Sequence, residues 1–284
     1  MKAIKTVRDR LPKRVTLVTH PRPHTDDIAG FWLFRRYLPE CARSPFRFVS
    51  SKEKDPGRAN EIWVGVGRGR FDEHKGDIGE CAATLVYKYV QERRPDLSDA
   101  ERRALDRLVA WVRDEDTGLH DLDRDREFGV MSILRSYFDA HKHDSKELTR
   151  FGLEILDGIF ASLLSTERLA EDWERRVEFE SPWGRAVGLE TAAYGADDYA
   201  YTKGYQLLVL VNPERGFRHF RASAKSTADL SEAYETLMRL DPKSDWFLHH
   251  SKKLLLSGSD VAPDSKKSKL GLRDLIRVLQ PIGE

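Results

Sequence analysis

A short apolar run at residues 15–18 leads directly into a segment rich in histidine and aspartate. The run reads Val-Thr-Leu-Val, which is typical of a buried strand in a parallel sheet. The segment after it reads Thr19-His20-Pro21-Arg22-Pro23-His24-Thr25-Asp26-Asp27. Ligands of open α/β sheets bind at the carboxyl ends of the strands, and imidazole and carboxylate groups suit divalent metals. The pattern predicts a metal site, and the simpler alternative is that Asp26 or Asp27 only caps the next helix.

Strand and helix signals alternate over residues 14 to about 120. Strands are expected at 15–18, 46–50 and 62–66, and helices at 28–37, 80–93 and 98–113. The last helix begins with a capping box, because Ser98 is followed three residues later by Glu101. This alternation predicts a parallel sheet with covered faces, as in α/β proteins.

The second half of the chain shows a different order of expected secondary structure. Residues 128–176 are expected to be helical. Strands are then expected at 186–193, 205–211 and 217–223, and helices at 226–240 and 270–279. The interval 251–269 is rich in Ser, Lys, Gly, Asp and Pro, which predicts a loop. The domains expected are an α/β domain with a parallel sheet (1–125), a helical connector (126–180) and a smaller α+β domain (181–284).

Composition limits the possible partners and the compartment. The chain has 284 residues, 40% apolar and 33% charged, with a net charge of +1. A packed core is therefore expected, and no global basic field attracts nucleic acid or membrane. The two cysteines, Cys41 and Cys81, are too few for a disulfide framework. With no secretory signal or membrane span in the sequence, we expect a cytoplasmic protein.

Two further acidic groups could contribute to a metal site. Asp72-Glu73-His74 follows the apolar run at 62–66 after a glycine-rich turn, and Asp114-Glu115-Asp116 follows the helix expected at 98–113. Acids at a helix carboxyl end oppose the helix dipole, so a bound cation would offset their cost. Solvated charged loops are the alternative for both groups. The glycines at 65–69 lack the Lys-Ser/Thr of a phosphate loop, so they predict no such loop.

A candidate phosphate-binding segment lies near the end of the chain. The aromatic and apolar run Trp246-Phe247-Leu248 is followed by His249 and His250 and then by a segment rich in lysine. Its lysines are Lys252, Lys253, Lys266, Lys267 and Lys269. Such a cationic patch can face phosphate groups.

The order of these motifs resembles the DHH phosphoesterase superfamily and, within it, the melanocyte-proliferating-gene family of exonucleases. His20-x3-His24-x-Asp26 resembles the opening motif, and Asp72-Glu73-His74 resembles the Asp-His-His motif. The last acid of the metal domain looks like Asp116 or Asp114. Further similar stretches are residues 79–88, Ser181-Pro182-Trp183 and the run 246–251.

The resemblance implies an enzyme with two domains that hydrolyses phosphodiester bonds of RNA ends, short oligonucleotides or nucleotides. One or two Mn²⁺ or Mg²⁺ ions would be the cofactor, and a homodimer is possible. The metal ligands implied are His20, His24, Asp26, Glu73 and Asp116. His74 and Asp72 would be catalytic. The substrate would be bound by His249, His250, Lys252 and Arg221.

The chain departs from this pattern at two positions. The superfamily has an aspartate that bridges both metals at the end of its second strand, and the matching residue here is Gly65, in the apolar run at 62–66. Glu73 stands in place of the middle histidine of the Asp-His-His motif. Three alternatives follow for this chain. It binds one ion, or it binds two ions bridged by Asp72 or Asp27, or it is a catalytically degenerate protein that binds nucleotide or RNA or serves as an interaction subunit. A zinc amidohydrolase is a weaker alternative, because no later His-x2-His ligand pair follows the segment at 23–27.

Overall fold

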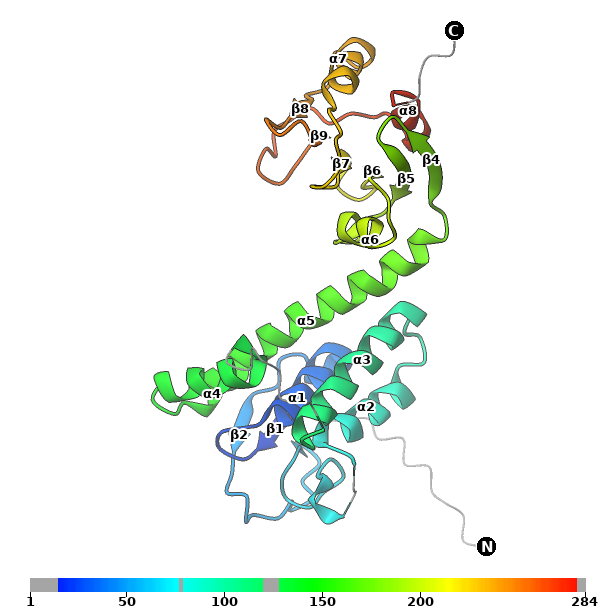
Figure 1. Ribbon diagram of the computed structural model, residues 1–284. Helices are drawn as coiled ribbons and strands as arrows, with labels where there is room; N and C mark the ends of the chain where they lie inside the picture. The colour runs from blue at the N-terminus through cyan, green and yellow to red at the C-terminus, as the bar shows by residue number, and fades with distance from the viewer. Residues whose placement is uncertain (1–14, 77–78, 120–127, 280–284) are drawn as a thin grey trace, which may run out of the picture. The chain divides into compact units, whose positions relative to one another are not determined.

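The computed structural model describes residues 15–76, 79–119 and 128–279. The chain divides into two compact units, Met1–Leu164 and Ser165–Glu284. The division falls within the long helix α5 (Ser145–Trp173), drawn in green in Figure 1. None of the helices in the described part of the chain is both long and apolar enough to cross a membrane.

The N-terminal unit contains a parallel three-stranded sheet. Its strands are β1 (Thr16–Thr19), β2 (Phe46–Phe48) and β3 (Glu61–Trp63), and their order is β2-β1-β3. Both neighbours of β1 run parallel to it. The α/β class predicted for this region is confirmed, although β2 and β3 end earlier than the apolar runs suggested.

Helices pack on one side of this sheet through a large apolar core. They are α1 (Thr25–Tyr37), α2 (Ala82–Arg93), α3 (Asp99–Asp116) and α4 (Val130–Ala140), and two 3-10 turns, Pro39–Cys41 and Glu73–Lys75, complete the unit. Leu17 of β1 and Ile62 of β3 belong to this core. Their neighbours Val18 and Trp63 belong to a smaller cluster, because successive side chains of a strand point to opposite faces.

The helix boundaries agree with the capping signals of the sequence. Ser98 is the N-cap of α3, where the backbone N–H of Glu101 donates to its Oγ and the Glu101 carboxylate accepts from the Ser98 N–H. The amino-terminal half of α5 packs on α1, since the indole N–H of Trp32 donates to Asp157 at 2.8 Å.

The C-terminal unit is built on a mixed six-stranded sheet. The strands are β4 (Val177–Ser181), β5 (Gly184–Glu190), β6 (Leu207–Val211), β7 (Arg218–Ala222), β8 (Phe247–Leu248) and β9 (Leu254–Ser257), in the order β4-β5-β6-β7-β9-β8. The helices α6 (Ala196–Thr202), α7 (Ser231–Leu240) and α8 (Leu272–Arg277) complete the unit. The predicted α+β class is confirmed.

One expectation for this unit is wrong. The interval 251–269 is not a loop throughout, because β9 lies within it. The apolar run Leu254-Leu255-Leu256 pairs with β7, and Leu255 is fully buried opposite Phe220. The polar composition of the whole interval hid a strand of four residues.

Candidate active site

The carboxyl end of β1 and the first turn of α1 bring two histidines around one buried carboxylate. His24 is the N-cap of α1, and its backbone N–H donates to Oδ2 of Asp27 at 2.9 Å. The same Oδ2 lies 3.0 Å from Nε2 of His20, while the hydroxyl of Thr19 donates to Oδ1 at 3.0 Å. Asp27 therefore caps the helix, as the simpler alternative required, and also binds the His20 ring.

A second group of ligand-type side chains joins three elements. Asp26 is buried in the first turn of α1 and accepts a hydrogen bond from the backbone N–H of Ala82, which begins α2. Asp116 is the last residue of α3. Ligand atoms of His24, Asp26 and Asp116 lie within 4.8 Å of one another, and those of His20, His24 and Asp27 do so as well. His24 thus belongs to both groups.

The third group is the 3-10 turn at residues 73–75. Asp72 caps this turn by accepting the His74 backbone N–H at 3.0 Å, and its Oδ2 accepts the backbone N–H of Arg68 at 2.5 Å. Nδ1 of the His74 ring lies 2.9 Å from Oδ1 of Asp72. Ligand atoms of Asp72, Glu73 and His74 also lie within 4.8 Å of one another.

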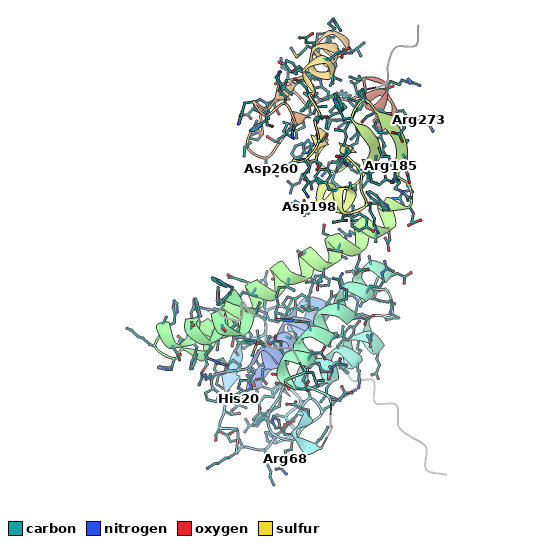
Figure 2. The ribbon with its side chains drawn as sticks, in the orientation of Figure 1. His20, Arg68, Arg185, Asp198, Asp260 and Arg273 are labelled. Carbon is teal, nitrogen blue, oxygen red and sulfur yellow. The ribbon has the colours of Figure 1, made fainter. Side chains whose placement is uncertain are left out.

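All three groups line one cavity of about 1030 Å³. The same cavity is lined by Lys52 and Lys54, which follow β2, and by Arg68, which follows β3. Figure 2 labels His20 and Arg68 on this unit. Acids and histidines from three distant segments of the chain thus share one cavity with exposed cations, and Asp114 is instead paired with Arg113 at 2.7 Å.

A known family matches the part of the chain that carries this cavity. The family model described as ChrB, C-terminal domain, matches residues 17–163. This chain belongs to the ChrB C-terminal domain family. The matched region contains every cavity residue named above, from His20 to Asp116. No curated protein matches the chain.

Two solved structures are similar to this ChrB-family chain. One is described as a DHH domain of a member of a family of ribosomal proteins, with 11% identity, a TM-score of 0.33, and coverage of 94% of this chain and 86% of that chain. The other is RecJ from Thermus thermophilus in complex with Mg²⁺, with 12% identity, a TM-score of 0.31, and coverage of 95% of this chain and 49% of that chain. Because the identities and TM-scores are this low, the resemblance to the exonuclease family stays a prediction from the motifs.

The electrostatics of the ChrB-family cavity favour a bound cation. Burial raises the pKa of Asp26 well above its usual range, and the nearby Asp27 and Asp116 carboxylates raise it further. Burial likewise raises the pKa values of Glu73 and Asp116. Asp26 is buried and Glu73 is half-buried, and all three carboxylates lie close to other carboxylates, which disfavours their charged forms. A divalent cation would relieve this repulsion.

The donor atoms also fit such a cation. Glu73 Oε2 is buried and accepts no hydrogen bond from any described residue. The His20 Nε2 and Asp27 Oδ2 atoms are 3.0 Å apart, which suits neighbouring ligands of a six-coordinate ion with bonds of about 2.1 Å. Nδ1 of His20 lies 2.9 Å from the Pro21 carbonyl oxygen, an interaction that fixes the ring and leaves Nε2 for the ion. The hydrogen bond to Asp27 raises the pKa of His20 to about 9. In the metal-free protein a proton therefore lies between Nε2 of His20 and Asp27, where the ion would otherwise bind.

The loop that carries Lys52 and Lys54 is hydrogen-bonded to the loop that carries Arg68. The backbone N–H of Asp55 donates to the Gly67 carbonyl at 3.0 Å. Gly67 has a φ of +87°, and a Cβ there would lie 2.9 Å from the Asp55 nitrogen, so only glycine permits this contact. Among the described residues, the charged ends of Lys52, Lys54 and Arg68 form no ion pair. No motif in the sequence pointed to these cations, and the only signal for one of them is the position of Arg68 in the glycine-rich segment.

The remaining predicted residues lie in the C-terminal unit. Arg221 on β7 forms an ion pair with Asp197, and Lys252 pairs with Asp229 at 2.8 Å. Nδ1 of His249 lies 2.8 Å from the Ser251 hydroxyl oxygen, and the His249 and His250 rings are 3.9 Å apart between centroids. These contacts of the four predicted residues lie within the C-terminal unit, and the one given for His250 is a ring contact.

Proposed function

We propose that this protein is a metal-dependent phosphoesterase that hydrolyses phosphodiester bonds in RNA ends, short oligonucleotides or nucleotides. The observation that carries the proposal is the composition of one cavity in the N-terminal unit, which combines clustered carboxylates and imidazoles with the side chains of Lys52, Lys54 and Arg68. The clustered acids suit divalent cations, and the basic side chains suit an anionic substrate.

His20, His24, Asp26, Glu73 and Asp116 would hold Mn²⁺ or Mg²⁺. When bound, such an ion supplies Lewis acidity toward water and toward the phosphoryl oxygens. The carboxylates and imidazoles that line the cavity would position that charge. The raised pKa values of Asp26, Glu73 and Asp116 are consistent with a site whose charge is balanced only when a cation is present.

His74 is the proposed proton carrier. Asp72 holds Nδ1 of the ring, which leaves Nε2 as the nitrogen that exchanges a proton with the leaving oxygen. Both oxygens of Asp72 already accept backbone N–H groups. Asp72 therefore acts through His74 as a positioning residue.

Lys52, Lys54 and Arg68 would bind the phosphate group that enters the cavity. In the C-terminal unit, the resemblance implies substrate binding by His249, His250, Lys252 and Arg221.

The test is hydrolysis of short RNA, short DNA, and linear and cyclic dinucleotides by the purified protein with and without Mn²⁺. We expect Mn²⁺-dependent turnover of at least one of these substrates, abolished in His20→Ala and Asp26→Ala. Full activity in excess chelator would contradict the proposal.

A second candidate function is binding of nucleotide or RNA without catalysis. The observation that favours it is Gly65, which contributes no carboxylate just beyond the carboxyl end of β3. Tight ligand binding with no turnover under any divalent metal would support this function over the first.

A further inference from the structure

Asp27 occupies the space that a side chain at position 65 would need, and both residues line the cavity. An ideal Cβ on Gly65 would lie only 1.9 Å from Oδ1 of Asp27 and 3.0 Å from its Cγ. The Gly65 φ of +62° places its backbone in the left-handed region, where glycine carries no strain. The carboxylate of Asp27 therefore fills the volume that any side chain at position 65 would need.

Several contacts fix Asp27 in this position. The residue is only 1% exposed. Thr19 donates to Oδ1, and the His24 backbone N–H donates to Oδ2, which also lies beside Nε2 of His20. These partners lie at the end of β1 and the start of α1. Gly65 follows β3, which pairs with β1, so the two segments are neighbours at this end of the sheet.

Asp27 is also central to the charged groups of the cavity. Its carboxylate acts electrostatically on Asp26, on Glu73 and on Asp116, which come from three different segments. It shares a potential ligand group with His20 and His24. A carboxylate in this place can neutralise a cation held by any of the three groups.

We propose that Asp27 is itself a ligand of the divalent cation and that position 65 is glycine in order to admit it. This inference rests on the proposed function, because it concerns the same cation. Asp27 would then bind the cation as well as cap α1. Gly65, which has no side chain, would contribute by leaving room for the Asp27 carboxylate.

Capping and metal binding can be separated by choice of substitution. Asp27→Asn keeps an oxygen that can accept the His24 N–H, so the cap persists while the negative charge is lost. Gly65→Ala leaves the charge of Asp27 unchanged and places a methyl group where its oxygen lies. Gly57→Ala is the matched control, because Gly57 has a similar φ of +70° with nothing within 4 Å of its added Cβ.

The experiment is a titration of the full-length chain with Mn²⁺ alone, in which free Mn²⁺ is measured by electron paramagnetic resonance. Removing a ligand or its support typically costs about 10–100-fold in metal affinity. We expect Asp27→Asn and Gly65→Ala each to weaken Mn²⁺ binding by about tenfold or more, and Gly57→Ala to bind like the wild type. Circular dichroism of each variant checks that the fold is retained.

The outcomes separate this inference from the proposed function. If the wild type binds Mn²⁺ and folded Asp27→Asn binds it equally well, Asp27 is no ligand and the inference fails while the proposed function stands. If folded Gly65→Ala binds like the wild type, the role assigned to Gly65 fails. If the wild type binds no divalent cation, the proposed function fails and the inference fails with it.

Discussion

Nδ1 of His74 lies 2.9 Å from Oδ1 of Asp72, and the side chain of His74 is 69% exposed while that of Asp72 is 3% exposed. A buried carboxylate thus holds an exposed ring at the edge of the cavity. Burial opposes protonation of His74, but the hydrogen bond to Asp72 and the charge of Glu73 raise its pKa overall. An imidazole held in this way can carry a proton to or from a substrate.

Loss of this imidazole is expected to reduce turnover strongly. Proton transfer by a positioned side chain contributes about 10²–10⁴-fold in rate, so His74→Gln should lower kcat by this factor. Asp72→Asn should lower kcat about 10–100-fold and change the pH–rate profile, because it alters how the ring is held. Steady-state kinetics over a pH series checks both, with His143→Gln as a control outside the cavity. Equal kcat in wild type and His74→Gln would contradict the assigned role.

Replacing Asp26 by asparagine is expected to stabilise the metal-free protein while it removes metal binding. The carboxylate is buried next to other acids, so its folded-state pKa is raised. The metal-free fold therefore loses stability as pH rises above about 3.8 toward that raised pKa. Asp26→Asn removes this cost and should increase the free energy of unfolding at neutral pH by about 0.5–2 kcal/mol, the range common for stabilising substitutions.

Thermal unfolding with and without Mn²⁺ measures both effects of Asp26→Asn. The wild type should gain stability on adding Mn²⁺, and the variant should not. A variant that is less stable than the metal-free wild type would show that Asp26 supports the fold rather than a cation.

The three cations of the cavity are expected to control substrate affinity rather than the chemical step. Exposed charge pairs contribute up to about 1 kcal/mol each, so Lys52→Ala, Lys54→Ala and Arg68→Ala should each raise KM up to about fivefold. Each should also reduce the salt dependence of binding, because one phosphate contact is lost. Lys225→Ala, an exposed lysine of the C-terminal unit, is the control. Unchanged KM in the triple variant would place the phosphate elsewhere.

The C-terminal unit is expected to lose stability in mild acid. Burial lowers the pKa of His219, and the Arg221 charge lowers it further, whereas the Gly258 carbonyl and Asp197 oppose the shift. The unfolded chain therefore binds a proton more readily, so the contribution of His219 is complete above about pH 6.5 and declines as pH falls below that value. Thermal unfolding of wild type and His219→Gln over a pH series from about 5 to about 8 tests this. The wild type should show the steeper loss on the acid side, and identical slopes would contradict the prediction.

Local signals in the sequence were enough to predict several of the residues that line the cavity. His20, His24 and Asp26 follow β1 directly, and the position of a strand end is visible in an apolar run. The capping box at Ser98 predicted where α3 begins, whereas the helix continues to Asp116, three residues beyond the expected end at 113. These features depend on residues close together in the chain.

The rest depends on contacts between distant segments. Lys52 and Lys54 lie in a polar segment without a recognisable motif, and a hydrogen bond from the Asp55 N–H to the Gly67 carbonyl joins this segment to the glycine-rich one that lines the same cavity. The closeness of Asp27 to Gly65 is likewise a product of the paired strands β1 and β3. In the sequence, Gly65 indicated only a missing carboxylate, and nothing near it showed that a side chain from the start of α1 fills its place.

The metal site can be located by anomalous X-ray diffraction from crystals of the chain grown with Mn²⁺. We expect a strong Mn peak in the N-terminal unit within coordination distance of His24 and of at least two carboxylates among Asp26, Asp27, Glu73 and Asp116. Saturating Mn²⁺ with no peak in this cavity, or with peaks only on other surfaces, would contradict this expectation.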